Sequence, residues 1–375
     1  MTYTDAIEAI TYRVQRILDT VGSSFPFVSD PETGEWETTA NGNWCPGHWI
    51  GLLWLTAQYL PNREESKRCQ NAARQYTEAA GWSDLTGSVF AGMNYRYAGF
   101  RARDIYNDQR LIELGLRGAT HVRDSFDESA KIVPVGSFGT RGLERHSSEA
   151  GNTTAAVDAI YTAIGPLWRA AAVSGDARYL EIARQHVDTH CRWFVRDDGA
   201  VWHKVSFHPD TKTVKQRYNQ LTQVPDSCWA RGLGWSIAGL VDAYNATKDT
   251  DYLSTLNQHV DYYSQWTPPD DVPFAEIGPN VPMDYRDTSA AALVAYGLVR
   301  LPDDDPHTVA LQKYGCDIVT TLITDYLIAN GASRGQLREG CYNAVDDIAT
   351  NHELVWATYY LLVALLVIHE PGGSS

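Results

Sequence analysis

The sequence predicts an all-α protein folded as an (α/α)6 barrel, with six inner helices ringed by six outer helices and a short β-hairpin insertion. Nearly all-apolar segments alternate with amphipathic ones along the chain. A helix that is apolar on every side must be enclosed, whereas an amphipathic helix can shield it from water. No Pro/Gly/Ser-rich linker or charge run separates two cores. We therefore expect one barrel domain over residues 1–370 and a short tail, 371–375.

The expected outer helices carry apolar residues on one face only. The first of them repeats Ile7, Ile10, Val14 and Ile17 at helical spacing. The polar-faced segments are 5–21, 62–80, 108–125, 177–195, 252–266 and 307–327, the last of mixed character. Between them lie the segments expected to form the inner ring: 44–60, 89–103, 154–172, 227–246, 288–301 and 352–368.

Three segments interrupt the helical rhythm. Residues 26–43 are rich in Gly, Pro, Asp and Thr, and we expect a loop there. Residues 131–151 also have the pattern of a long loop. Residues 200–224 alternate between apolar and polar side chains and then turn at His208-Pro209-Asp210-Thr211, which predicts a hairpin.

Charge and cysteine usage exclude several kinds of protein. The net charge of −15 argues against a nucleic-acid partner and against anionic membranes, because both need a basic surface. The first residues lack a signal-peptide pattern, and no apolar run has membrane-spanning length. The six cysteines show neither CxxC nor zinc-ligand spacing, so we expect no metal site, reduced thiols and a cytoplasmic location. The sequence sets no oligomeric state.

Asp158 is a single carboxylate within the apolar segment 154–172. One interpretation is an acid in the first turn of a helix, where the helix dipole favours negative charge. The other is a carboxyl group whose pKa is raised by apolar surroundings, so that it can donate a proton near neutral pH. The residues expected around it favour the second interpretation.

Aromatic and ionisable residues gather where the apolar segments begin, and in such a barrel those starts share one end. The candidates for binding are Trp44, Asn94, Trp229, Arg231, Trp235 and Asp287, with His203 from the hairpin. Flat aromatic faces suit the apolar side of a sugar ring, and an Arg suits a carboxylate. The structural alternatives are core positions for Trp229 and Trp235 and an N-cap for Asp287.

Several strings resemble the unsaturated glucuronyl hydrolases, glycoside hydrolase family 88. They are Arg196-Asp197-Asp198-Gly199, Asp226-Ser227-Cys228-Trp229-Ala230-Arg231-Gly232-Leu233-Gly234-Trp235, Pro269-Asp270-Asp271-Val272-Pro273 and Arg286-Asp287-Thr288-Ser289-Ala290. The start of segment 44–60 and the end of the chain, from Trp356, resemble the first and last inner helices of that family. The resemblance implies an (α/α)6 barrel.

The resemblance also implies roles for single residues. Asp158 corresponds to the aspartate that acts as general acid and base. A second aspartate of that family, in an Asp-Leu-Gly-Phe string, is replaced here by Phe90 in Phe90-Ala91-Gly92-Met93. A substrate-binding Gln corresponds to Gln220 or Gln223, and we take Gln223.

The activity implied is the release of a 4,5-unsaturated uronic acid from the non-reducing end of oligosaccharides that a polysaccharide lyase produces. Protonation of the vinyl ether and addition of water need no metal or organic cofactor, and the partner is a uronate-containing oligosaccharide. Two alternatives stay open. A lyase or other uronate-acting enzyme would use Asn94, Tyr95 or Tyr97, Arg96 and His203. A non-catalytic sugar-binding protein would explain Phe90.

Overall fold

The computed structural model describes residues 1–85, 87–106, 108–136, 151–282 and 284–369. The expected tail, 371–375, and most of the expected loop 131–151 lie outside these residues. In the part of the chain that is described, no helix has the length and apolar character needed to cross a bilayer.

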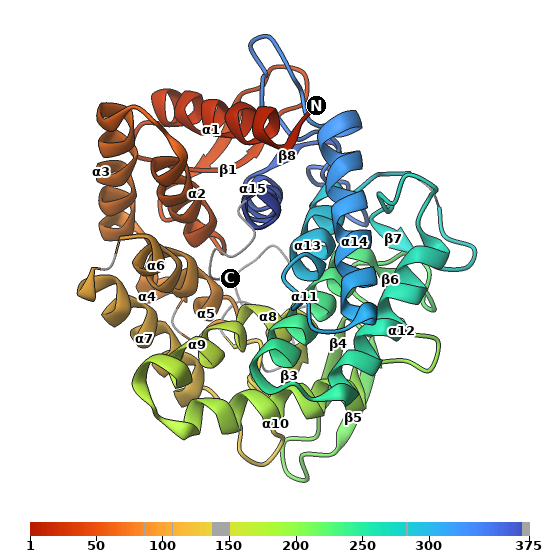
Figure 1. Cartoon of the computed structure of the whole chain (residues 1–375). Coiled ribbons are helices and arrows are strands. Elements are labelled where there is room, and N and C mark those ends of the chain that lie inside the picture. The colour runs from red at the N-terminus through yellow and green to blue at the C-terminus, as the bar shows by residue number, and fades with distance from the viewer. Residues whose placement is uncertain (86, 107, 137–150, 283, 370–375) are drawn as a thin grey trace.

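The helices form two concentric rings (Figure 1). The outer ring consists of α1 (Tyr3–Thr20), α3 (Arg63–Ala79), α7 (Gln109–Asp124), α10 (Ala177–Trp193), α12 (Thr250–Trp266) and α14 (Pro306–Thr321). The inner ring consists of α2 (Pro46–Tyr59), α5 (Ala91–Tyr95) with its continuation, α8 (Ala159–Thr162) with α9 (Gly165–Ser174), α11 (Ala230–Thr247), α13 (Thr288–Leu298) and α15 (Val355–His369). The predicted (α/α)6 barrel is confirmed.

Burial follows the predicted alternation. Every residue of the inner helix α13 is buried, and α15 is buried from Val355 to Leu365. The outer helix α3 buries only Cys69, Ala72, Ala73 and Tyr76. The all-apolar helices therefore fill the centre, and the amphipathic helices separate them from water.

Capping residues define where each outer helix begins. The N-cap side chains that accept a backbone N–H of the first turn are Thr2, Asn62, Asp108, Asp176, Asp249 and Asp305. Each such cap stabilises its helix by about 1 kcal/mol. These caps explain why the outer helices lie close to their expected bounds.

The segment 154–172 is not one continuous helix, which corrects the prediction. It begins as β3 (Thr154–Ala156), which pairs antiparallel with β4 (Lys204–Phe207). The helical part that follows is divided, because Pro166 has no N–H to donate and occurs in the first turn of α9. Asp158 lies between the strand and α8.

Two other segments also differ from expectation. The inner segment 89–103 changes from α5 to a π-helix, η1 (Arg96–Arg101), and then to α6 (Ala102–Tyr106). The expected loop 26–43 contains a hairpin of β1 (Phe25–Ser29) and β2 (Trp36–Thr39), so that prediction is wrong. β1 also pairs with β8 (Glu353–Leu354), a long-range contact that local composition does not reveal.

The predicted hairpin within 200–224 is confirmed and positions the site. β4 pairs with β5 (Val214–Tyr218), and with β3 they form a three-stranded sheet in the order β3-β4-β5. The backbone N–H of Val157 donates to the carbonyl of His203 at 2.9 Å. This sheet therefore holds Asp158 and His203 next to each other. A second small sheet joins β6 (Cys228–Trp229) to β7 (Glu276–Ile277), just before α11 begins.

Candidate active site

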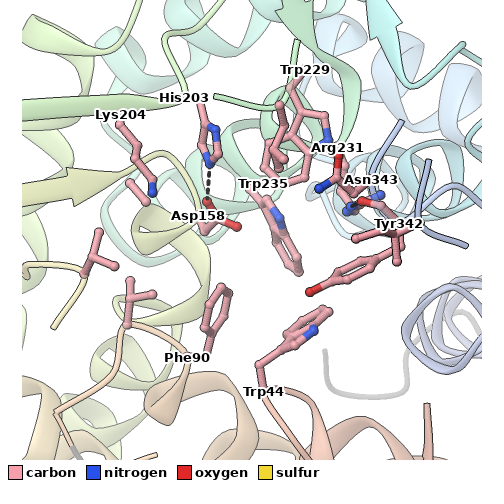
Figure 2. A pocket seen from close by; sticks show the side chains of 15 residues that line it. Trp44, Phe90, Asp158, His203, Lys204, Trp229, Arg231, Trp235, Tyr342 and Asn343 are labelled. Atoms are coloured by element: carbon pink, nitrogen blue, oxygen red, sulfur yellow. Dashed lines mark hydrogen bonds and ion pairs between the residues drawn. The ribbon is translucent and has the colours of Figure 1, made fainter. Parts of the chain in front are cut away.

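A cavity with about 750 Å³ of empty space, including solvent at its mouth, opens at the barrel end where the inner helices begin (Figure 2). Its described lining residues are Trp44, Val89, Phe90, Val135, Ala156, Asp158, His203, Lys204, Leu221, Trp229, Arg231, Trp235, Tyr342, Asn343 and Ile348. Six of the nine site residues predicted from the sequence are among them: Trp44, Asp158, His203, Trp229, Arg231 and Trp235. The inner-helix starts thus converge on one mouth, as expected.

Asp158 lies at the N-terminus of α8, but its side chain makes no capping hydrogen bond to that helix. The residue is only 5% exposed and lines the cavity. Of the lining residues that the structure describes, Asp158 is the only acidic one. The capping interpretation therefore receives no support, and a carboxyl group directed at a bound molecule fits the geometry.

His203 is the residue paired with Asp158. Its Nε2 atom lies 4.0 Å from Oδ2 of Asp158, as the dashed line in Figure 2 marks. Burial, with smaller effects from Lys204 and Arg231, lowers the pKa of His203 well below its ordinary value. The imidazole is therefore neutral and offers one donor and one acceptor nitrogen. The His203 ring also contacts Trp229 at 4.9 Å between centroids.

Lys204 is a lining residue that the sequence reasoning missed. It begins β4 directly after His203, and it is 7% exposed. A lysine is almost never this buried without a charged or polar partner. Its place in an alternating apolar strand was the signal that could have identified it. Lys204 supplies the cavity with an ammonium group on the same strand end as His203.

Arg231, in the first turn of α11, uses most of its guanidinium for contacts within the protein. Its Nη1 donates to Oδ2 of Asp287 at 2.6 Å and to the carbonyl of Cys341 at 2.5 Å. Its Nη2 donates to the carbonyl of Tyr342 at 2.6 Å. The guanidinium also lies over the Trp229 ring at 4.8 Å. Arg231 therefore holds the segment that carries Tyr342 against the cavity.

An aromatic wall faces Asp158 and His203 across the cavity (Figure 2). Trp44 and Tyr342 are nearly parallel, with ring planes 9° apart and centroids 6.4 Å apart. Phe90 lies 5.2 Å from Trp44 and lines the cavity, as the resemblance implied for that position. Such flat faces suit the apolar side of a sugar ring. Tyr342 and Asn343 were missed because their loop has no distinct sequence pattern.

The structure does not place Asn94 on the cavity wall. Asn94 is fully buried, and its Oδ1 accepts the N–H of Gly47 at 2.7 Å. Its Nδ2 donates to the carbonyls of Trp44 and Phe90, each at 2.8 Å. The amide is therefore used to position two wall residues rather than to contact a ligand.

Asp287 and Gln223 also lie away from the wall. Asp287 is fully buried as the N-cap of α13, and it accepts hydrogen bonds from Ser289 and from Arg231. Asp287 is therefore a helix N-cap, which was the structural alternative to a binding role. Gln223 is exposed, and its backbone N–H donates to Oε2 of Glu276 at 2.8 Å. Asp287 had been suggested by its place at an expected inner-helix start, and Gln223 by the family resemblance. Within the described residues, no three His, Cys, Asp or Glu side chains gather as metal ligands.

The fold and the cavity define a class: a helical-barrel protein whose mouth combines an aromatic wall, two cations and a buried carboxyl group suited to a sugar acid. No family model matches the chain.

Similar curated proteins identify a narrower group than the class defined by the fold and cavity. An unsaturated glucuronyl hydrolase from Bacillus sp. strain GL1 is 25% identical over 357 residues, covering 94% of this chain and 92% of that protein. An unsaturated chondroitin disaccharide hydrolase from Streptococcus agalactiae serotype III is 24% identical, with 98% and 91% covered.

Solved structures show the same fold. The unsaturated glucuronyl hydrolase of Bacillus sp. GL1 superposes with a TM-score of 0.87 at 22% identity, covering 99% of this chain and 97% of that chain. An unsaturated glucuronyl hydrolase variant solved with dGlcA-Glc-Rha-Glc gives a TM-score of 0.88 at 23% identity, with the same coverage. The resemblance stated from the sequence is confirmed: this chain is a homologue of the unsaturated glucuronyl hydrolases.

Proposed function

We propose that the protein is a glycoside hydrolase that releases a 4,5-unsaturated uronic acid from the non-reducing end of oligosaccharides. One observation carries the proposal. Asp158, the only acidic residue of the described cavity lining, faces an aromatic wall in a chain whose curated relatives are unsaturated glucuronyl and chondroitin disaccharide hydrolases. The partner is accordingly a uronate-containing oligosaccharide.

In the proposed reaction Asp158 acts twice. Its protonated carboxyl group donates a proton to C4 of the vinyl ether, and positive charge develops at C5 and the ring oxygen. Water adds at C5 and gives a proton to the Asp158 carboxylate, which restores the acid. The hemiketal formed then opens, so that the linked sugar leaves and a keto-uronic acid remains. Because one carboxyl group serves both steps, the reaction tolerates Phe90.

The remaining cavity residues bind and orient the substrate. Trp44 and Tyr342 present nearly parallel faces on which a pyranose ring can pack. Lys204 supplies a positive charge for the uronate carboxylate, and the neutral ring of His203 can hydrogen-bond to the sugar beside Asp158. Arg231 acts mainly by positioning Tyr342, because its donors are engaged within the protein.

The geometry gives little support to the lyase alternative. Tyr95, Arg96 and Tyr97, which that chemistry would use, are absent from the described cavity lining. Tyr97 instead donates its hydroxyl to Tyr161 at 2.9 Å within the barrel core. Phe90 remains the one observation that favours a non-catalytic sugar-binding protein.

Ultraviolet absorbance separates the three functions. The hydrolase removes the conjugated double bond, so absorbance falls when an unsaturated disaccharide is added. A lyase would instead raise the absorbance of intact polysaccharide, and a binding protein would bind the disaccharide without turnover. The unsaturated disaccharides tested should include lyase products of chondroitin and of heparin. One relative is named for chondroitin disaccharides, and one solved neighbour is described as specific for heparin.

We further propose a cytoplasmic location. All six cysteines are free thiols, and four of them are buried. Free thiols are typical of a reducing compartment. Labelling of the unfolded chain from cells with a thiol reagent would report six reactive cysteines if this expectation holds.

A further inference from the structure

A second cavity, with about 490 Å³ of empty space, lies at the other end of the barrel. Its described lining residues are Arg96, Tyr97, Phe100, Arg101, Arg169, Tyr296, Arg300, Tyr359 and Val363. Helix α11 gives its position. Arg231, in the first turn of α11, lines the first cavity. Asp242, which pairs with Arg96 and Arg300 of the second cavity, lies eleven residues further along the same helix, about 16 Å away at 1.5 Å per residue.

A layer of hydrogen-bonded tyrosines lies between the two cavities. The hydroxyl of Tyr161 donates to that of Tyr296 at 2.8 Å, and Tyr97 and Tyr360 share a hydrogen bond of 2.8 Å. Trp235, on the wall of the first cavity, stacks on Tyr161 at 5.5 Å. The second cavity is therefore separate from the candidate active site.

The second cavity concentrates positive charge in an acidic protein. Four of its lining residues, here called the arginine cluster, are Arg96, Arg101, Arg169 and Arg300, and the described lining contains no acidic residue. The chain as a whole carries a net charge of −15. Positively charged guanidinium groups around one cavity repel each other unless a negatively charged group lies between them. Negative charge near the cluster therefore compensates this repulsion.

One carboxylate supplies part of that compensation. Asp242 accepts a hydrogen bond of 2.5 Å from Arg96 and another of 2.5 Å from Arg300. Burial alone would raise the pKa of Asp242, but Arg300 and Arg96 hold that pKa below its ordinary value, so the group is ionised. A single negative charge is thus shared by two guanidinium groups. Arg101 lines the cavity, and the ion pairs of the cluster among the described residues are those of Arg96 and Arg300 only.

Arg300 provides an independent observation. Its side chain is only 5% exposed, its Nε donates to the carbonyl of Tyr296, and its Nη1 donates to Asp242. Its Nη2 is buried and has no hydrogen-bond partner among the described residues. A buried guanidinium nitrogen without an acceptor costs free energy, so such a donor at a cavity wall indicates a missing ligand atom.

The π-helix η1 brings the guanidinium groups of Arg96 and Arg101 to the same side of the second cavity. Arg96 and Arg101 are the ends of the π-helix η1. Hydrogen bonds in a π-helix join residues five apart, so these two side chains lie one turn apart on one face. π-Helical turns are uncommon and occur frequently at functional sites. In an α-helix the same two residues would point in clearly different directions.

We propose that the arginine cluster binds a small tetrahedral oxyanion, phosphate or sulfate. Guanidinium groups match such ions in charge and in paired N–H donors. The orphan Nη2 of Arg300 and the guanidinium of Arg101 are the first donors the ion would use. The proposal is independent of the activity assigned to the first cavity.

Isothermal titration of the full chain with sodium phosphate and with sodium sulfate, against a chloride background of equal ionic strength, tests this site. We expect saturable binding of at least one ion. Arg101→Gln should weaken that binding about tenfold or more, since it removes a charge-assisted contact. The matched control is Arg63→Gln, an exposed arginine at the start of α3, which should bind as the parent does.

A second variant, Arg300→Lys, removes the Nη2 donor and should also weaken ion binding. Its thermal melt shows whether the variant still folds. If Arg300→Lys does not fold, the ion affinity of Arg101→Gln alone tests the proposed site. Equal affinity in the parent and Arg101→Gln would place the ion elsewhere, including near Lys204 in the first cavity, and would overturn the proposal. Heats that never saturate would also overturn it, because they indicate general salt effects.

Discussion

The Nε2 atom of His203 lies 4.0 Å from Oδ2 of Asp158, and the backbones of these two segments are joined by the hydrogen bond from Val157 to His203. The pairing of β3 with β4 therefore sets the distance between the candidate acid and a neutral imidazole. Because burial keeps the imidazole uncharged, His203 can act toward Asp158 or a bound sugar as a neutral hydrogen-bonding group. Asp158 and the neutral imidazole of His203 therefore line the same side of the cavity.

Lys204→Gln should raise KM for an unsaturated disaccharide by about ten- to a hundredfold, because a charge-assisted contact to the uronate carboxylate is lost. Lys215→Gln is the matched control, since Lys215 is exposed on β5 of the same sheet. Steady-state kinetics measure both. A KM for Lys204→Gln equal to that of the control would show that Lys204 does not contact the substrate.

Trp235→Ala and Tyr342→Ala should separate packing from sugar binding. Trp235 is 1% exposed and stacks on Tyr161, so its truncation should lower the free energy of unfolding by about 3–5 kcal/mol. Tyr342 is only half-buried at the cavity, so its truncation should mainly raise KM. Thermal melts and kinetics on both variants check this. An unchanged KM in Tyr342→Ala would argue against the aromatic wall as a sugar platform.

Much of the fold could be predicted from the sequence, because a repeated alternation of apolar and amphipathic helices has few solutions other than a closed double ring. Residues 154–156 could not be assigned correctly, because their strand depends on pairing with residues 204–206, some fifty positions away. The same reason applies to β1, which pairs with Glu353 and Leu354 near the end of the chain.

The site was only partly predictable, for a different reason. Asp158, Trp44 and Arg231 were found because polar or aromatic residues at inner-helix starts must face the mouth. Asn94 and Asp287 fit the same rule, yet the structure uses their hydrogen bonds to hold backbone and Arg231. Sequence position shows which end of the barrel a residue occupies, but not whether its polar atoms are already satisfied.

Five buried histidines among the described residues should make stability depend on pH. Burial lowers the pKa of His48 and of His186 to about 3 and that of His259 to about 4, and it lowers those of His190 and His203 well below the ordinary 6.5. Below pH 6.5 the unfolded chain therefore binds protons that the folded chain excludes. The free energy of unfolding should fall as pH drops from about 6.5, by up to about 1.4 kcal/mol per pH unit for each histidine.

Urea denaturation at pH 7.0, 6.0 and 5.0 measures this slope. His186→Asn is the informative variant, because the asparagine Oδ1 lies nearly where Nδ1 of His186 does and can still accept the N–H of Val133. The variant should show a shallower loss of stability in the same pH window. Identical slopes in parent and variant would show that His186 does not contribute.

Phe90→Asp should restore a second carboxylate beside the first. Phe90 lines the same cavity as Asp158, so the added negative charge should raise the pKa at which Asp158 loses its proton. The basic limb of the kcat/KM profile should then move to higher pH than in the parent. Phe90→Asn is the control, since it is polar and close in size to Asp but uncharged. A folded Phe90→Asp variant whose basic limb matches the Asn variant would show that position 90 does not influence the acid.

The central claim is that Asp158 is the proton donor, and the initial rate of absorbance loss from an unsaturated disaccharide tests it most directly in Asp158→Asn. The amide keeps the shape of the side chain but cannot donate the proton, so kcat should fall by about 10²–10⁴-fold while the thermal melt stays close to that of the parent. Asp317→Asn, an exposed acid on α14, should keep the parent rate. A folded Asp158→Asn variant with kcat within about tenfold of the parent would contradict the account.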